Sequence, residues 1–90
     1  GYTPTQGAAD LRDRLKADVS ALGHPDRDVI VTSGTSGGLL LALLAVVDPG
    51  DEVIVPDPYF VAYPHLVTLA GGTSVYVDTY PSFALDPARV

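Results

Sequence analysis

The sequence has no cysteine, no methionine and no tryptophan among its 90 residues. Without cysteine there is no disulfide framework, no thiolate zinc site and no thiol nucleophile, which fits a reducing compartment. The first residue is Gly1 and no methionine is present, so we expect a fragment that is truncated at both ends. A content of 47% hydrophobic and 18% charged residues is typical of a globular domain or part of one.

Positive charge and long apolar runs are also scarce. Five lysine and arginine residues are scattered among eleven acidic ones, and the net charge is −6. Such a chain does not attract a phosphate backbone, so we expect no nucleic-acid partner. The longest apolar run, residues 39–47, is far shorter than the roughly 20 residues that span a bilayer. We therefore expect a cytoplasmic protein that binds small molecules and does not enter a membrane.

The apolar residues predict an alternation of helices and strands. In chain order we expect a surface helix over residues 5–22, a buried strand over 29–32, a buried helix over 39–47, a strand over 53–55, a helix over 64–70 and a strand over 73–77. This order implies right-handed crossovers and an α/β layered domain. Asp86 followed by Pro87 predicts a helix N-cap where the sequence stops.

A turn rich in serine and glycine, residues 33–38, lies between the first expected strand and the next helix. Backbone N–H groups, hydroxyls and a positive helix end would meet there, as in sites for phosphate or carboxylate groups. The spacing is neither that of the P-loop nor that of the dinucleotide-binding glycine motif. On the residues alone, a purely structural turn is an equal alternative.

A second candidate site follows the strand at residues 53–55. The loop contains Asp57 between two prolines and then Phe60 and Tyr63, at the sheet edge where α/β proteins place their ligands. Phe60 could stack on a flat ligand ring. The alternative is that Phe60 and Tyr63 cover the core, and that Asp57 belongs to a simple turn.

These residues together resemble the class I and II aminotransferases. The landmarks occur in family order across nearly the whole chain: residues 2–4 with Gly7 and residues 11–12, the turn 33–38, residues 48–53, the loop 58–63 and residues 69–72. The resemblance implies a three-layer α/β fold with mostly parallel strands and flanking helices, of which residues 1–90 would be a partial large domain. It also implies pyridoxal 5'-phosphate (PLP) as cofactor, amino-acid and 2-oxo-acid substrates, and a homodimer.

The resemblance assigns cofactor contacts residue by residue. Gly34, Thr35 and Ser36 match the positions that hold the PLP phosphate, and Phe60 matches the aromatic ring that stacks on the PLP pyridine. Tyr2 matches a tyrosine that reaches the phosphate of the neighbouring subunit. Tyr63 matches a position beneath the cofactor, or it belongs to the core.

The family's catalytic groups have no counterpart in this sequence. Relatives need a lysine that binds PLP covalently, an acid at the pyridine nitrogen and usually an arginine for the substrate carboxylate. Lys16, Arg12 and Arg14 are interpreted as surface cations on a charged helix, so no catalytic residue is assigned. His24 and His65 lack the neighbours of a metal site, and we expect no metal.

Three other functions remain open from the sequence. A PLP-dependent lyase, decarboxylase or synthase could share these motifs, because residues elsewhere select the reaction. A PLP-sensing domain of a transcription regulator would share them without catalysis, and a dinucleotide-binding oxidoreductase is a third possibility.

The resemblance further implies that the strand at 29–32 lies far from the other two strands, which pair with each other.

Overall fold

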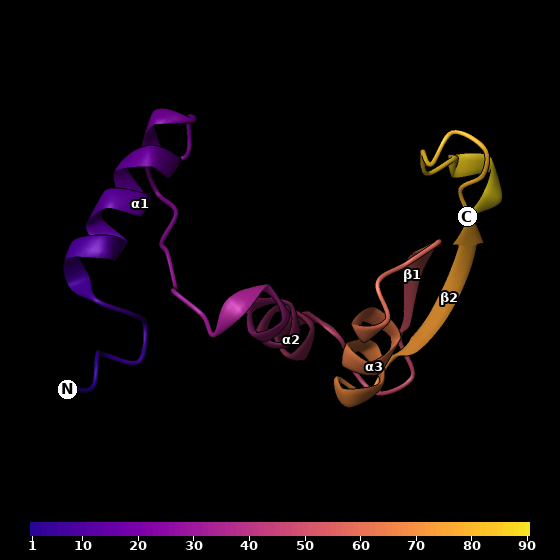
Figure 1. Ribbon diagram of the computed structural model, residues 1–90, viewed down its shortest axis with the longest axis horizontal. Coiled ribbons are helices and arrows are strands. Elements are labelled where there is room, and N and C mark those ends of the chain that lie inside the picture. Colours follow the sequence, from indigo (N-terminus) through magenta and orange to yellow (C-terminus); the bar gives the residue numbers. More distant parts are fainter. The chain divides into compact units, whose positions relative to one another are not determined.

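The computed structural model describes residues 1–90, which divide into two compact units, Gly1–Gly38 and Leu39–Val90. Figure 1 shows the order of the elements: α1, α2, β1, α3, β2 and a terminal 3-10 turn.

The first unit contains the amphipathic helix predicted near the start of the chain. Helix α1 spans Ala9–Ala21, and Gly23 follows it with a φ of 94°, so the expected helix end is confirmed. The helix begins later than predicted because the chain first makes a turn in which the Gly7 N–H donates to the Pro4 carbonyl, 2.9 Å away. Gly7 has a φ of 106°, which the helix could not accommodate.

The strand predicted at residues 29–32 is absent, and that prediction was wrong. This segment carries no strand ladder: the Val31 N–H donates to the Gln6 carbonyl over 2.9 Å, and the Thr32 carbonyl accepts from the Gly34 N–H over 3.0 Å. A strand exists only where a neighbouring strand supplies hydrogen bonds, and this unit contains no second strand. The β-branched composition of the segment is therefore not sufficient to make it a strand.

Helix α2 spans Gly34–Val46, so it begins inside the serine- and glycine-rich turn and not at Leu39 as predicted. None of its residues is buried, and Leu41 and Leu44 are each more than half exposed. The expectation of a helix packed deep against a sheet was wrong for these residues. A two-stranded sheet is too small to cover an apolar helix on every side.

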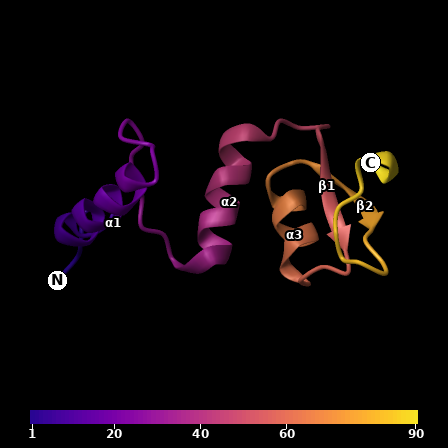
Figure 2. The ribbon, with the colours of Figure 1, turned by 90° about the horizontal axis from the view of Figure 1, so that it is seen from above.

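The second unit confirms the predicted strand, helix, strand order. Strand β1 spans Glu52–Asp57, helix α3 spans Ala62–Leu69 and strand β2 spans Thr73–Asp78. The two strands pair in parallel over their full lengths, from Glu52 opposite Thr73 to Asp57 opposite Asp78. Helix α3 packs against both strands (Figure 2). The predicted α/β class with parallel strands is confirmed.

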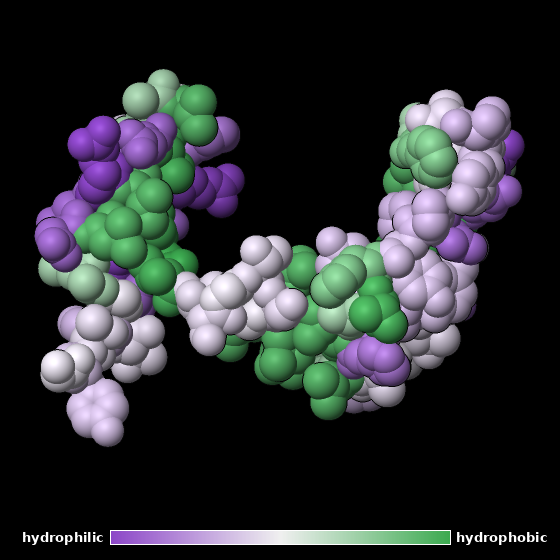
Figure 3. Space-filling model, viewed as in Figure 1, coloured by the Kyte–Doolittle hydropathy of each residue, from purple (hydrophilic) through white to green (hydrophobic).

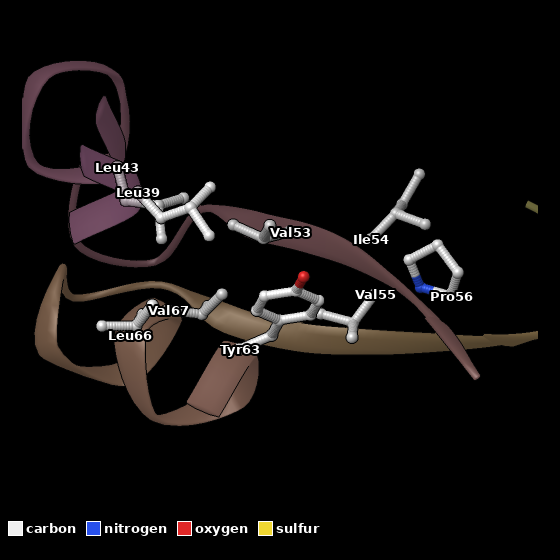
Figure 4. Close-up of a pocket in the computed structure, with 9 residues that line it drawn as sticks. All are labelled: Leu39, Leu43, Val53, Ile54, Val55, Pro56, Tyr63, Leu66 and Val67. Atoms are coloured by element: carbon white, nitrogen blue, oxygen red, sulfur yellow. The ribbon is translucent and has the colours of Figure 1, made fainter. Parts of the chain in front are cut away.

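The core of the second unit is small and lies between α3 and the strands. Five apolar residues are buried: Val55, Leu66, Val67, Ala70 and Val77. Beside this core, side chains of α2, β1 and α3 line a pocket of about 210 Å³ in which the Tyr63 ring points from α3 towards Val55 (Figure 4). Further apolar side chains are visible on the surface around α2 and α3 (Figure 3).

Both strands of the sheet are tied together where they end. The carbonyl oxygen of Asp57 accepts two hydrogen bonds from Thr79, one from its N–H at 2.9 Å and one from its hydroxyl at 2.8 Å. The chain then reaches the 3-10 turn Pro87–Arg89, where the Asp86 carboxylate accepts from the Ala88 N–H and confirms the predicted N-cap. No helix is long and apolar enough to cross a membrane.

Candidate functional site

The turn that opens α2 forms a helix N-terminus at Gly34. The Gly34 N–H donates to the Thr32 carbonyl at 3.0 Å, and the Thr32 hydroxyl donates back to the Gly34 carbonyl at 2.9 Å. The chain enters the helix through a φ of +70° at Gly34, a left-handed conformation that favours glycine. The first N–H groups of a helix have no acceptor within it, so those of Thr35 and Ser36 remain available.

The structure thus brings Gly34, Thr35 and Ser36 together as the first three residues of α2, all exposed. The N–H groups of Thr35 and Ser36, the hydroxyls of both residues and the positive end of the helix form a surface that favours an anion. Close packing preserves this turn, because a Cβ atom at Gly38 would lie 3.0 Å from the Thr32 hydroxyl oxygen.

Tyr2 lies at the start of the first unit, whereas the turn that opens α2 lies near the end of that unit's sequence. The Tyr2 side chain is fully exposed. It precedes the Gly7 turn, in a segment without regular structure. No ring contact or hydrogen bond joins Tyr2 to the turn that opens α2. The role expected for Tyr2 concerns a neighbouring subunit, so it stays a prediction.

Phe60 lies in the second unit, in the loop between β1 and α3. Its side chain is 60% exposed, which counts against the alternative that it covers the core. The Tyr63 ring meets it edge-on, with ring centroids 5.8 Å apart and an interplanar angle of 73°. The Tyr63 N–H also donates to the Phe60 carbonyl at 3.0 Å. Phe60 is therefore an exposed aromatic ring with a defined support.

The residue before Phe60 makes a ring contact that the sequence did not reveal. Tyr59 stacks on Tyr76 of β2, with centroids 5.1 Å apart and planes tilted by 30°. The charge of an ionised Tyr76, partial desolvation and the Asp57 carboxylate raise the pKa of Tyr59. The only signal for this contact in the sequence is the aromatic Tyr76 between two valines, which marks the other face of the strand.

Asp28 forms ion pairs with two of the three cations of α1 that were interpreted as surface charges. The Arg12 guanidinium donates to the Val29 carbonyl at 3.0 Å and to the Asp28 carboxylate at 3.2 Å, and its side chain is only 21% exposed. The surface interpretation was therefore wrong for Arg12, which holds residues 28–29 against α1. Lys16 is half exposed and pairs with Asp28 at 3.6 Å, whereas Arg14 is 81% exposed as expected.

The electrostatics of Asp28 follow from these neighbours. A hydrogen bond from the Val29 N–H, with the charges of Lys16 and Arg12 beside it, lowers the pKa of the Asp28 carboxyl against a smaller opposing effect of desolvation. Asp57 is the last residue of β1, and its carbonyl oxygen accepts a hydrogen bond from the Thr79 hydroxyl. No cluster of histidine, cysteine and acidic residues suitable for a metal ion occurs in the chain.

The element order and the parallel strand pair place the chain in the α/β class. Residues 1–89 match the family model described as aminotransferase class I and II, and the chain belongs to this family.

Several characterised relatives support the assignment. The chain is 42% identical, over 99% of its length, to the aspartate/prephenate aminotransferase of Thermus thermophilus. It is 40% identical, over 86% of its length, to the aspartate aminotransferase of Bacillus subtilis. The crystal structure of an aspartate aminotransferase from Thermotoga maritima superposes with a TM-score of 0.86 at 35% identity, over 98% of this chain.

The chain spans only part of these proteins. It covers 24% of the Thermus enzyme, 20% of the Bacillus enzyme and 25% of the Thermotoga structure.

Proposed function

We propose that residues 1–90 are part of the large domain of a longer, PLP-dependent aminotransferase. That protein transfers an amino group between an amino acid and a 2-oxo acid. The observation that supports this most is the family match over residues 1–89, together with relatives that are each named as aminotransferases. When bound, PLP accepts the amino group from one substrate and passes it to the other.

In this proposal, Gly34, Thr35 and Ser36 hold the PLP phosphate. The residues fit the group, since the start of α2 offers free N–H donors and exposed hydroxyls on a positive helix end. The left-handed Gly34 and the hydrogen bonds between Thr32 and Gly34 fix the path of the chain into that helix. The turn would orient the cofactor without taking part in proton transfer.

Phe60 supplies the second contact, a ring stacked on the pyridine of PLP. Its 60% exposed side chain and its edge-on support from Tyr63 suit a ring that presents one face to a flat ligand. Such a contact holds the cofactor plane and excludes water from one of its faces.

Tyr2 is proposed to act in a homodimer. Its full exposure leaves it available to reach the cofactor phosphate of a second subunit. The hydroxyl would then donate a hydrogen bond to a phosphate oxygen. Tyr2→Phe in the full-length protein would weaken PLP binding. The mass of the dimer, measured by light scattering, would not change.

The relatives favour an aminotransferase over the lyases, decarboxylases, synthases and transcription regulators that share the motifs. They are named for aspartate and prephenate, and a Pyrococcus structure that also matches is named an aromatic aminotransferase. Aspartate is therefore the amino donor to test first, followed by aromatic amino acids.

The experiment is a visible absorption spectrum of the purified full-length protein, recorded before and after amino acids are added. A PLP band that shifts with an amino acid, together with 2-oxo-acid-dependent amino transfer, supports the proposal. A shift accompanied by loss of carbon dioxide or by elimination would select a lyase or decarboxylase. No PLP band after reconstitution with the cofactor would refute the PLP site.

A further inference from the structure

The aromatic side chains of the second unit form three ring pairs. Two of these pairs meet at the loop between β1 and α3, where Tyr59 contacts Tyr76 and Phe60 contacts Tyr63. The third pair, Tyr80 with Phe83, lies beyond the end of β2, with centroids 5.0 Å apart. The loop that carries Phe60 is thus held by two ring contacts from two different elements.

Tyr76 has a position fixed by the sheet. It lies in β2 directly opposite Val55 of β1, and Val55 is buried, with only 3% of its surface exposed. The Tyr59 ring rests on Tyr76 at a centroid distance of 5.1 Å, although Tyr59 belongs to the loop. The ladder between β1 and β2 therefore determines where the Tyr59 side chain is held.

Phe60 is the next residue after Tyr59, so anchoring one restricts the other. Among the aromatic rings, Tyr63 is the one that contacts the Phe60 ring, edge-on at 5.8 Å. An exposed ring with a single such contact keeps rotational freedom, unless its backbone is also held. The Tyr59 to Tyr76 stack supplies that second restraint on the side of the loop nearest to the sheet.

We infer that Tyr76 is a positioning residue for Phe60, acting through Tyr59, and that it sets the orientation of the ring that meets the cofactor. The inference rests on the proposed function for the identity of that cofactor. Tyr76 does not itself touch the cofactor. The raised pKa of Tyr59 agrees with this arrangement, because Tyr76 is the largest of its causes.

The test uses the full-length protein with Tyr76→Leu, which removes the ring, and Tyr76→Phe, which keeps it. The control is Tyr80→Leu, which removes a ring from the pair beyond β2 and leaves both loop contacts intact. One measurement is hydrogen exchange of peptides covering residues 58–63 in the apoprotein. The others are the PLP dissociation constant and the visible circular dichroism of bound PLP.

We expect Tyr76→Leu to speed exchange at residues 58–63 and to raise the PLP dissociation constant about two- to tenfold, the range of one aromatic pair. The visible dichroism band of PLP bound to the Tyr76→Leu variant should change. Tyr76→Phe and Tyr80→Leu should match the parent in all three measurements. Parental exchange and parental PLP binding in Tyr76→Leu would overturn the positioning role.

A different outcome concerns the proposed function alone. If the parent binds no PLP, the cofactor assignment fails, and the role of Tyr76 towards the cofactor fails with it. Hydrogen exchange of the apoprotein still decides whether Tyr76 holds the loop. If Tyr80→Leu alters exchange and PLP binding as strongly as Tyr76→Leu, the effect is general destabilisation and the positioning role is wrong.

Discussion

The Nε atom of Arg12 lies 3.0 Å from the carbonyl oxygen of Val29, to which it donates a hydrogen bond from the side of α1. A second nitrogen of the same guanidinium contacts Asp28. Arg12→Ala should free residues 28–32 and destabilise the unit by about 1–2 kcal/mol, since hydrogen bonds from a charged group are lost. Hydrogen exchange of the Val31 amide in the full-length protein measures this.

Arg14→Ala is the matched control for Arg12. Arg14 is 81% exposed and pairs with Asp18 at 3.8 Å, so its removal should cost less than about 0.5 kcal/mol. Equal acceleration of Val31 exchange in both variants would show that the Arg12 contacts contribute nothing specific.

Gly7 is a buried glycine whose replacement combines two penalties. Its φ is 106°, and a Cβ atom there would lie 2.7 Å from the Cβ of Val31. Gly7→Ala should therefore cost the roughly 1–2 kcal/mol of a left-handed residue and about 1–3 kcal/mol more for the overlap. Denaturant unfolding followed by a probe in the first unit is the measurement.

Gly23→Ala separates these two penalties. Gly23 has a φ of 94° and no atom within 4 Å of its ideal Cβ, so only the conformational cost applies. If both variants lose the same stability, the predicted contact between residues 7 and 31 does not form.

The hydrogen bond and the ion pairs of Asp28 predict that the fold is sensitive to acid. The folded-state pKa of Asp28 is lowered, chiefly by the hydrogen bond from Val29, so the folded state binds this proton less tightly than the unfolded chain. Its stabilising contribution is complete above the unfolded pKa of about 4 and disappears as the pH falls through the lower folded value. Thermal unfolding recorded down to acidic pH should show this loss.

Asp28→Asn should remove that part of the acid sensitivity, because the amide does not titrate. Asp26→Asn, which changes an exposed aspartate two residues earlier, should keep it. Identical pH profiles for the Asp28 variant and the parent would contradict the prediction.

Thr35 tests the phosphate turn. Thr35→Ala removes one hydroxyl from the exposed start of α2, and a hydrogen bond to a charged phosphate is worth about 1.5–3 kcal/mol. We expect the PLP dissociation constant of the full-length protein to rise about tenfold to a hundredfold. Thr68→Ala is the control, because the Thr68 hydroxyl donates to the Pro64 carbonyl within α3. Equal PLP affinities in the two variants would show that the Thr35 hydroxyl does not bind the phosphate.

The 90-residue chain on its own should be catalytically inactive and incompletely folded. It contains no lysine other than Lys16, which is engaged by Asp28, and the second unit buries only five apolar residues. A small core stabilises a chain weakly, and the open edge of β1 invites association. A sharp thermal transition of a monomer, or amino transfer that survives rigorous purification, would contradict this.

The elements that the sequence predicted best are those whose partners lie nearby in the chain. Residues 53–55 and 73–77 became strands because a single helix separates them and each supplies the other's ladder. Residues 29–32 have a similar β-branched composition, yet no strand is at hand to pair with them. Strand formation depends on a pair of segments, so composition alone could not distinguish these cases.

The candidate site shows the same limit. Gly34, Thr35, Ser36 and Phe60 could be found from local motifs, but the start of α2 was predicted too late because glycine and serine are weak helix formers. Tyr76 could not be found, since its contact with Tyr59 depends on the register that places it opposite Val55. Arg12 was misinterpreted for a related reason: its partners lie across a turn.

The double hydrogen bond from Thr79 to the Asp57 carbonyl also bears on how this protein can change during evolution. It fixes the point at which the chain leaves β2 to the point at which the Phe60 loop begins. Insertions, deletions and sequence drift after Thr79 can then accumulate without moving that loop. The same changes between Asp57 and Ala62 would shift Phe60 directly. Variation in length should therefore be tolerated after Thr79 and selected against between Asp57 and Ala62.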